Sequence, residues 1–437
     1  MTVNDTTAPI NFSYLPLHEI IFSYYSRITM GDILMDFIDE QFISNTSMKT
    51  LHTYIRGNHL TKGSVAMLRK IIIQIVKAEK AFYDTEFTHA IIHTNDVHGS
   101  IPILVQSEIE KKMRWTNSYT FQIGKRDFSI HLAHEMKNSA GTLQKLLKKI
   151  FMWFYVANSF APSSECSRRM NIFIYFTSLL KLLPSVRNVA ICQEHANSAF
   201  TTSCKPETEI NVYREEEWFK VLIHETFHAM GFDFSAVDCV ESNNTILGMF
   251  PVASDVRVFE TYSETWAEII HVLFVSYFSS RQNENLDDFV HKILVKTENL
   301  LIKERVFSLF QCAKVLNYYK LTYENLYKNT SKDHVMRTQR YKENTQVFSY
   351  YILKSITMFF VNDFLEWCGE NNTKKSIVFT TNSRTIGSYC DFFREHYTNP
   401  IYVACLGEFE EWFSKNALLE KGFNGLEMKT LRMSITQ

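Results

Sequence analysis

The stretch Val221-Leu222-Ile223-His224-Glu225-Thr226-Phe227-His228-Ala229-Met230 contains one intact H-E-x-x-H motif. On a helix of 3.6 residues per turn, His224 and His228 lie one turn apart on the same face, so both imidazoles can reach one metal ion. Glu225 lies beside that position and can act as a base towards water. Two imidazoles, a third protein ligand and a water suit zinc, whose sites are mostly tetrahedral. The motif therefore predicts one zinc ion per chain, with His224 and His228 as ligands and Glu225 as the catalytic base.

The residues around the motif favour a buried helix. Three acids, residues 215–217, stand where a helix dipole favours negative charge. Gly231 follows the motif, where a left-handed C-terminal cap is expected. The positions between are mostly apolar, and two histidines and an acid would be costly to bury there without partners. This cost favours a metal site over the alternative, a core helix with incidental polar residues.

The composition indicates a globular chain with a large core. The chain has 437 residues, of which 46% are hydrophobic and 14% aromatic, and its formal net charge is −1. This length suits two or three domains, or one large catalytic unit with helical additions. The lack of a general positive charge argues against nucleic acid as the main partner.

The cysteines and the first residues predict an intracellular protein. The eight cysteines are scattered and include no C-x-x-C pair, so we expect reduced thiols and no disulfide framework or zinc cluster. The N-terminus lacks the basic start and apolar run of a signal peptide. The longest apolar stretches are too short or too interrupted to span a bilayer. We therefore expect a cytoplasmic protein that is not secreted by a signal peptide.

Sequence patterning divides the chain into three regions. Residues 1–116 and 283–437 show mostly helical periodicity, clearest up to about residue 95, whereas residues 117–282 mix strands and helices. The middle region begins with a hairpin and continues with a helix, three strands and the motif helix. The hairpin is expected at residues 119–123 and 128–132, the helix at 139–157, and the strands at 171–176, 196–201 and 209–213.

This order of elements, with the motif helix directly after the last strand, resembles the catalytic core of the zincin metallopeptidases. The resemblance implies an α+β fold in which a twisted mixed sheet packs over the motif helix, with helical regions before and after it. It also implies that an edge strand lies along an extended peptide substrate. Residues 197–200 are the candidate edge, and an ordinary short strand is the alternative.

A second helix, after an expected long loop at residues 231–253, carries an acidic stripe. Glu260, Glu264 and Glu268 follow one another at i, i+4 and i+8 among apolar residues. The loop lacks the G-x-x-H continuation of metzincins, and the stripe resembles the gluzincin subset, in which a glutamate from a later helix completes the zinc site. The resemblance implies that Glu264 is the third ligand and that Glu268 orients His224. Glu260 remains the alternative ligand.

Gluzincins often carry a helical C-terminal lobe that supplies a Tyr or a His to the transition state. The resemblance therefore implies a donor in the last third of this chain. Tyr350 and Tyr351 are the candidates, with His334 and His396 as further possibilities. Packing is the alternative role for each.

Taken with the resemblance, these residues predict a zinc-dependent metallopeptidase that hydrolyses a peptide or protein substrate. Glu225 would take a proton from a zinc-activated water and pass it to the leaving amine. One alternative is a non-catalytic structural or virion-associated protein that retains a zincin fold, which an AT-rich origin such as a large DNA virus would suit. Another is hydrolysis of a non-peptide amide or ester. The intact Glu225 favours catalysis, because a purely structural zinc site needs no base.

Overall fold

The computed structural model forms two compact units, each assembled from segments that are separate in the sequence. Helices and a mixed sheet are both present, so the α+β class is confirmed. The zincin-like core and the three-region division stay predictions. Unit 1 comprises Met1–Thr29, Arg69–Leu180 and Ser198–Phe232, and unit 2 comprises Met30–Leu68, Lys181–Asn197 and Asp233–Gln437. The structure describes residues 8–10, 29–92, 99–161, 166–280, 285–372, 377–416 and 425–436.

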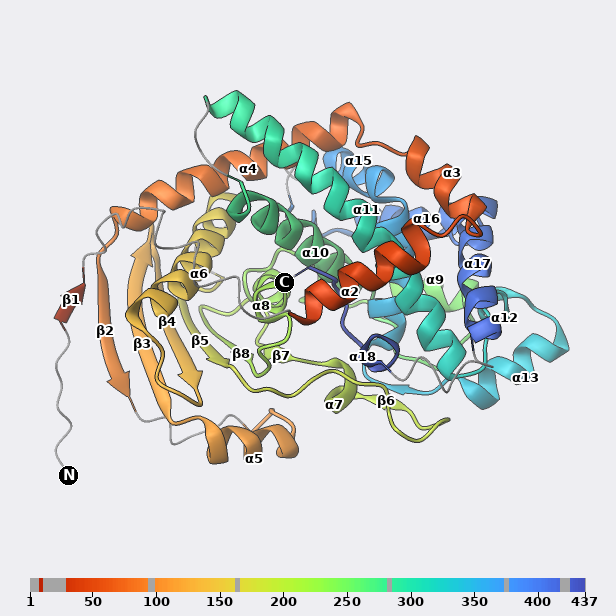
Figure 1. Ribbon diagram of the computed structural model, residues 1–437, viewed down its shortest axis with the longest axis horizontal. Helices are drawn as coiled ribbons and strands as arrows, with labels where there is room; N and C mark the ends of the chain where they lie inside the picture. Colours follow the sequence, from red (N-terminus) through yellow and green to blue (C-terminus); the bar gives the residue numbers. More distant parts are fainter. Residues whose placement is uncertain are drawn as a thin grey trace. The chain divides into compact units, whose positions relative to one another are not determined.

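Unit 1 is built on a seven-stranded mixed sheet in the order β1-β2-β3-β4-β5-β8-β7 (Figure 1). From β1 to β4, each strand pairs with the next in the antiparallel direction. Strands β4, β5 and β8 run parallel to one another, and the edge strand β7 is antiparallel to β8. The strands are β1 Ala8–Ile10, β2 Phe87–Ile92, β3 Trp115–Ile123, β4 Arg126–His134, β5 Arg169–Tyr175, β7 Ala199–Thr201 and β8 Glu207–Val212.

The predicted hairpin is confirmed as β3 and β4. Ile123 pairs with Arg126, and Gly124 between them has a φ of 61°, which this tight turn requires. Strands β5 and β8 also match their predictions, whereas β7 is shorter because the residues before it form helix α7, Gln193–Ala196. The helical N-terminal region also contains strands that its periodicity did not predict, β1 and β2. Strand β2 is held by pairing with β3, a long-range contact that local periodicity does not reveal.

Helices cover both faces of this sheet. On one face, α6, Ala140–Phe160, packs its aromatic rings on the strands, with centroids 5.3 Å apart for Phe121 and Phe151 and 4.8 Å apart for Phe128 and Phe154. Ser139 caps α6 by accepting the Thr142 N–H, as the predicted start of this helix requires. On the other face, α5, Ile103–Lys112, contributes to a buried cluster made of Ile101, Val105, Ile109, Ala133, Tyr175 and Tyr213.

The motif helix α8, Trp218–Ala229, is fastened to α6 by one buried polar contact. The indole Nε1 of Trp153 donates to Oγ1 of Thr226 at 2.9 Å, and that hydroxyl donates to the Leu222 carbonyl at 2.7 Å. The rings of Trp153 and Phe227 lie nearly parallel, at 8°, with centroids 6.5 Å apart. Because Thr226 lies between the two motif histidines in sequence, this contact fixes how α8 is rotated about its axis.

We expect Thr226→Val to lower the free energy of unfolding by about 1–3 kcal/mol, because a methyl group replaces the acceptor of a buried indole N–H. The valine has nearly the same shape, so the effect reports the hydrogen bond and not a cavity. Denaturant unfolding measures it. Thr226→Ser, which keeps the hydroxyl, is the matched control and should lose less; equal losses in the two variants would show that the contact is not the cause.

Unit 2 is helical and is centred on α10, Val258–Phe278, and α11, Leu286–Tyr318. A π-helical segment η2, Phe348–Leu353, continues into α14, Lys354–Phe359, and both pack against these two helices. Residues 430–436 are also buried in this unit. There Glu304 of α11 accepts the backbone N–H groups of Ile435 and Thr436 at 2.9 and 3.0 Å.

The remaining elements of unit 2 are mostly short helices. The predicted long loop after the motif helix is wrong in part, because residues 240–249 form α9, which packs against α16. Its two adjacent asparagines and a glycine hide the helical pattern from sequence reasoning. The elements are α2 Met30–Ile38, η1 Asp39–Ile43, α3 Lys49–Gly57, β6 Ile191–Cys192, α9 Val240–Met249, α12 Tyr323–Tyr327, α13 Ser331–Arg340, β9 Glu343–Asn344, α15 Val361–Asn371, α16 Ser383–His396, α17 Pro400–Asn416 and α18 Leu426–Lys429; α4, Lys62–Tyr83, has residues in both units.

Candidate metal centre

The motif helix is buried along nearly its whole length, from Phe219 to Ala229. It follows β8 after a short turn in which Glu217 has a φ of 57°, so the helix begins at Trp218. The acids at residues 215–217 therefore precede the helix and do not form its first turn. Burial places His224, Glu225 and His228 in a medium where polar groups are costly without partners.

His224 and His228 present the same nitrogen to each other. Their Nε2 atoms lie 3.0 Å apart, with ring centroids 4.8 Å apart and ring planes at 80°. Their side chains are nearly inaccessible, with 6% and 8% of the residue surface exposed. Two nitrogens bound to one tetrahedral zinc at ~2.0–2.1 Å would be about 3.3 Å apart. The spacing and the ligand type of this pair therefore fit one zinc ion.

Glu225 is also buried, with 8% of its surface exposed. Its charge acts on Tyr213, the residue directly after β8. Burial raises the pKa of the Tyr213 phenol most, Glu225 raises it further, and Arg214 opposes both. The resulting pKa lies well above the ordinary value, so this tyrosine stays a neutral hydroxyl beside an acid.

The C-terminal end of α8 is closed by a Schellman motif. Gly231 has a φ of 67°, as predicted for the cap, and its N–H donates to the His228 carbonyl at 3.2 Å. The N–H of Phe232 donates to the Phe227 carbonyl at 2.8 Å. The last turn, which carries His228, is thereby held in place.

A disulfide between Cys166 and Cys204 lies at this end of the helix, with Cα atoms 4.6 Å apart. The prediction that all the cysteines are reduced thiols is wrong for this pair. Strands β5 and β8 are parallel neighbours, and Arg169 of β5 pairs with Glu207 of β8. Cys166 precedes Arg169 by three residues, and Cys204 precedes Glu207 by three residues. Only the strand register, which the sequence does not show, brings the two sulfurs together.

In unit 2, the acidic stripe of α10 is buried, but its three acids have different partners. The Tyr350 hydroxyl donates to Oε2 of Glu260 at 3.1 Å. Nζ of Lys354 lies 3.8 Å from Oε1 of Glu264 and forms a close ion pair with Oε2 of Glu268. Two acids of the stripe therefore share one buried cation, and the third accepts a neutral hydroxyl.

Lys354 is the residue that sequence reasoning missed. Burial lowers the pKa of its ammonium, but Glu268 and Glu264 outweigh burial and the net pKa is raised, so the lysine is charged. The sequence contains a pattern that could have indicated its role. Lys354 is the sole charged residue between positions 347 and 361, so its apolar neighbours predict a buried charge, and it follows Tyr350 by four residues, about one helical turn.

We expect Lys354→Met to destabilise the fold by about 3–5 kcal/mol, because it removes the cation from two buried carboxylates. Adding Glu264→Gln and Glu268→Gln to this variant should recover part of the loss, since the charges themselves are then gone. Denaturant unfolding of the wild type, of Lys354→Met and of the triple variant measures these changes in the free energy of unfolding. The matched control is Lys415→Met, whose exposed partner Glu411 lies 2.6 Å away and which should cost less than about 1 kcal/mol. Equal losses for the two lysines would contradict the ion-pair assignment.

The two candidate tyrosine donors differ. Tyr350 contacts Glu260, whereas the Tyr351 hydroxyl donates to the Leu431 carbonyl at 2.5 Å. His396 stacks on Phe360 with centroids 4.1 Å apart. His334 lies exposed on α13. Tyr350 therefore contacts the acidic stripe directly.

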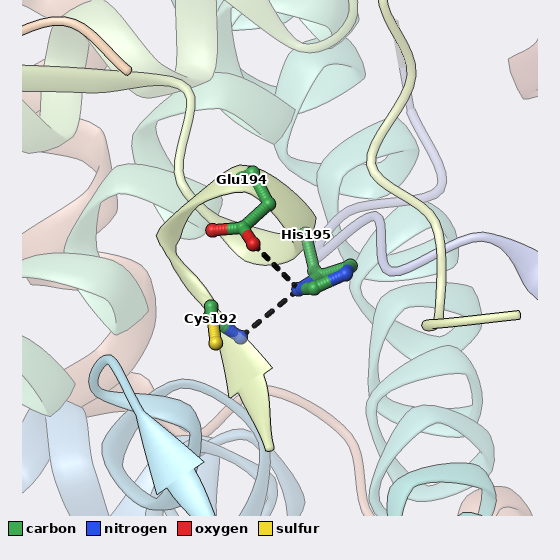
Figure 2. Close-up of side chains that lie close together, drawn as sticks. All are labelled: Cys192, Glu194 and His195. Atoms are coloured by element: carbon green, nitrogen blue, oxygen red, sulfur yellow. Dashed lines mark hydrogen bonds and ion pairs between the residues drawn. The ribbon is translucent and has the colours of Figure 1, made fainter. Parts of the chain in front are cut away.

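A second group of metal-binding residue types lies at α7. Figure 2 shows Cys192, Glu194 and His195 close together. The Cys192 N–H donates to Nδ1 of His195 at 3.0 Å, and the Cys192 side chain accepts the backbone N–H of His195. The two residues therefore cap this short helix reciprocally. Burial raises the pKa of the Cys192 thiol, which disfavours the thiolate that a metal needs, so we assign this group to capping.

No family model matches this chain, and neither a curated protein nor a solved structure matches it. In the described parts of the chain, no helix combines the length and the apolar character needed to cross a membrane.

Proposed function

We propose that this protein is a zinc-dependent metallopeptidase of the gluzincin type. The observation that carries the proposal is the pair of buried Nε2 atoms of His224 and His228, 3.0 Å apart on a helix that also carries Glu225. Aliphatic or amide side chains would satisfy a core helix at lower cost than two imidazoles and a carboxylate. A shared metal ion gives these buried groups a common partner.

We further propose that Glu260 supplies the third ligand, in place of Glu264. Within unit 2, the two acids have different environments. A carboxylate that neutralises a buried ammonium is less available to a second cation, and Lys354 is held between Glu264 and Glu268. Glu260 instead accepts the Tyr350 hydroxyl, which orients the carboxylate without competing for its charge. His224, His228 and Glu260 would offer two nitrogens and one oxygen, a set that suits zinc.

In this proposal, zinc bound to the site would lower the pKa of a water molecule and polarise a substrate carbonyl. Glu225 takes the proton from the attacking water and delivers it to the leaving amine nitrogen. Tyr350 positions Glu260 through its hydroxyl, and a transition-state role for this tyrosine stays a prediction, as does orientation of His224 by Glu268. The substrate class is a peptide or protein.

Metal titration of matched variants tests the ligands. We expect His224→Ala and His228→Ala to abolish zinc binding. Glu260→Gln keeps the shape of the side chain and the hydrogen bond to Tyr350. It should lower the zinc affinity by more than roughly 10- to 100-fold, the loss typical when a residue that hydrogen-bonds to a metal ligand is removed. Glu264→Gln is the matched control on the same helix and should retain zinc. Loss of zinc in Glu264→Gln and not in Glu260→Gln would reverse the assignment.

Peptide-library cleavage tests the activity. The wild-type protein should cleave peptides and stop when a chelator removes the metal. Glu225→Gln should keep its zinc content and its stability but lose turnover by at least ~100-fold, because the base is gone and the shape is kept. Zinc bound without cleavage of any peptide would contradict the peptidase and favour a structural role. A Gln variant as active as the wild type would contradict the role of Glu225.

A further inference from the structure

The Cys166–Cys204 disulfide contacts the end of the motif helix directly. A methyl group at Gly231 would lie 3.3 Å from Sγ of Cys166 and 3.4 Å from Sγ of Cys204, so the disulfide rests against the residue that ends α8. The backbone N–H of Cys204 donates to the His228 carbonyl at 3.2 Å. The two sulfurs thus lie beside the glycine that caps α8, and the backbone of Cys204 hydrogen-bonds to the helix itself.

Ser167 makes a second attachment from the same segment. Its hydroxyl, fully buried, donates to the Ala229 carbonyl at 2.6 Å and accepts the Thr208 hydroxyl at 2.9 Å. Its N–H donates to the Lys205 carbonyl at 2.6 Å. We call Cys166, Ser167 and Cys204 the clasp. The clasp satisfies the carbonyl of Ala229 and adds a second donor to that of His228, which also accepts the N–H of Gly231.

The backbone of the clasp adopts conformations that it would not keep alone. Ser167 has a φ of 56° and Cys204 has a φ of 27°. Both values lie in the left-handed region, which residues other than glycine rarely adopt. Such conformations persist where the surroundings over-determine them. The disulfide is the covalent part of those surroundings, so opening it allows both segments to relax away from the helix end.

We propose that Cys166–Cys204 is a redox-responsive site that controls metal binding by the motif helix. When the disulfide opens, the last turn of α8 loosens and His228 no longer holds its nitrogen 3.0 Å from that of His224. The effect on the metal rests on the proposed zinc site, whereas the effect on the helix end does not. The disulfide that closes the clasp is thereby a condition for tight zinc binding.

The pair is accessible to a reductant. Both clasp cysteines are partly exposed, whereas Cys239, Cys312, Cys368, Cys390 and Cys405 are buried. A dithiol supplies two electrons and two protons: one of its thiolates attacks a clasp sulfur, the S–S bond breaks, and the second thiol releases the protein as two cysteine thiols with a cyclic disulfide as product. Reoxidation by a disulfide of the same class closes the clasp again.

Zinc affinity of the oxidised and reduced full-length protein tests the proposal. Competition with a chromophoric chelator should show that reduction raises the Kd for zinc by at least about tenfold, the scale of losing a partner of a ligand. New thiols could bind zinc themselves, so the double variant Cys166→Ser/Cys204→Ser provides an open clasp without thiols and should match the reduced protein. Cys239→Ser, taken through the same treatment, is the matched control and should respond to reduction as the wild type does. Wild-type affinity in a folded double variant would overturn the proposal.

Amide hydrogen exchange keeps the test independent of how the double variant folds. On reduction of the wild-type protein, the amides of Gly231 and Phe232 should exchange faster, while those of Tyr119 and Ile130 in the β3–β4 ladder should not change. Unchanged exchange at Gly231 and Phe232 would overturn the clasp. An oxidised protein that binds no zinc would instead overturn the proposed metal site, and the exchange data would still decide whether the disulfide holds the helix end.

Discussion

Burial of the motif helix is the constraint on which the rest of unit 1 depends. The two imidazoles and the carboxylate of this helix lose their hydration inside a hydrophobic core. Other contacts have to replace each lost contact with water. Several replacements are visible. Trp153 and Thr226 connect the helix to α6, and the Schellman motif and the clasp satisfy the carbonyls at its end. The histidine pair is left with nitrogens directed at each other, an arrangement that a core would not need for packing alone.

The same constraint separates the three acids of α10. Burying three carboxylates on one face of a helix requires compensation, and unit 2 provides it unevenly, with an ammonium for Glu264 and Glu268 and a phenol for Glu260. A cation and a neutral donor leave a carboxylate in different states: the first neutralises its charge and the second leaves the charge in place. The acid that accepts the phenol is therefore the one we propose as the metal ligand. In the proposed site, the choice of ligand thus depends on residues of another helix and not on spacing along α10.

Sequence patterns predicted the parts of the fold that local contacts determine. The β3–β4 hairpin, α6, β5 and the motif helix carry their periodicity and turn or cap residues within a few positions, and they stand where predicted. Strand β2, the Cys166–Cys204 disulfide and the ion pairs of Lys354 depend on which segments become neighbours, and periodicity contains no such information. The histidines were found because their spacing is local. The sequence predicted Glu264 as the third ligand, with Glu260 as the alternative, whereas the proposal of Glu260 uses contacts with Tyr350 and Lys354, about 90 residues later.

His228 connects the two chemical features of the motif helix. Its ring faces His224 and its carbonyl accepts the N–H of Cys204, so the position of one residue enters both the proposed zinc site and the clasp. Thermodynamic linkage then requires the coupling to be reciprocal. If the closed disulfide favours zinc by some factor, bound zinc favours the closed disulfide by the same factor, so the metal makes the pair harder to reduce. Under these two proposals, redox state and metal occupancy are not independent: a change in either one would shift the other through the last turn of α8.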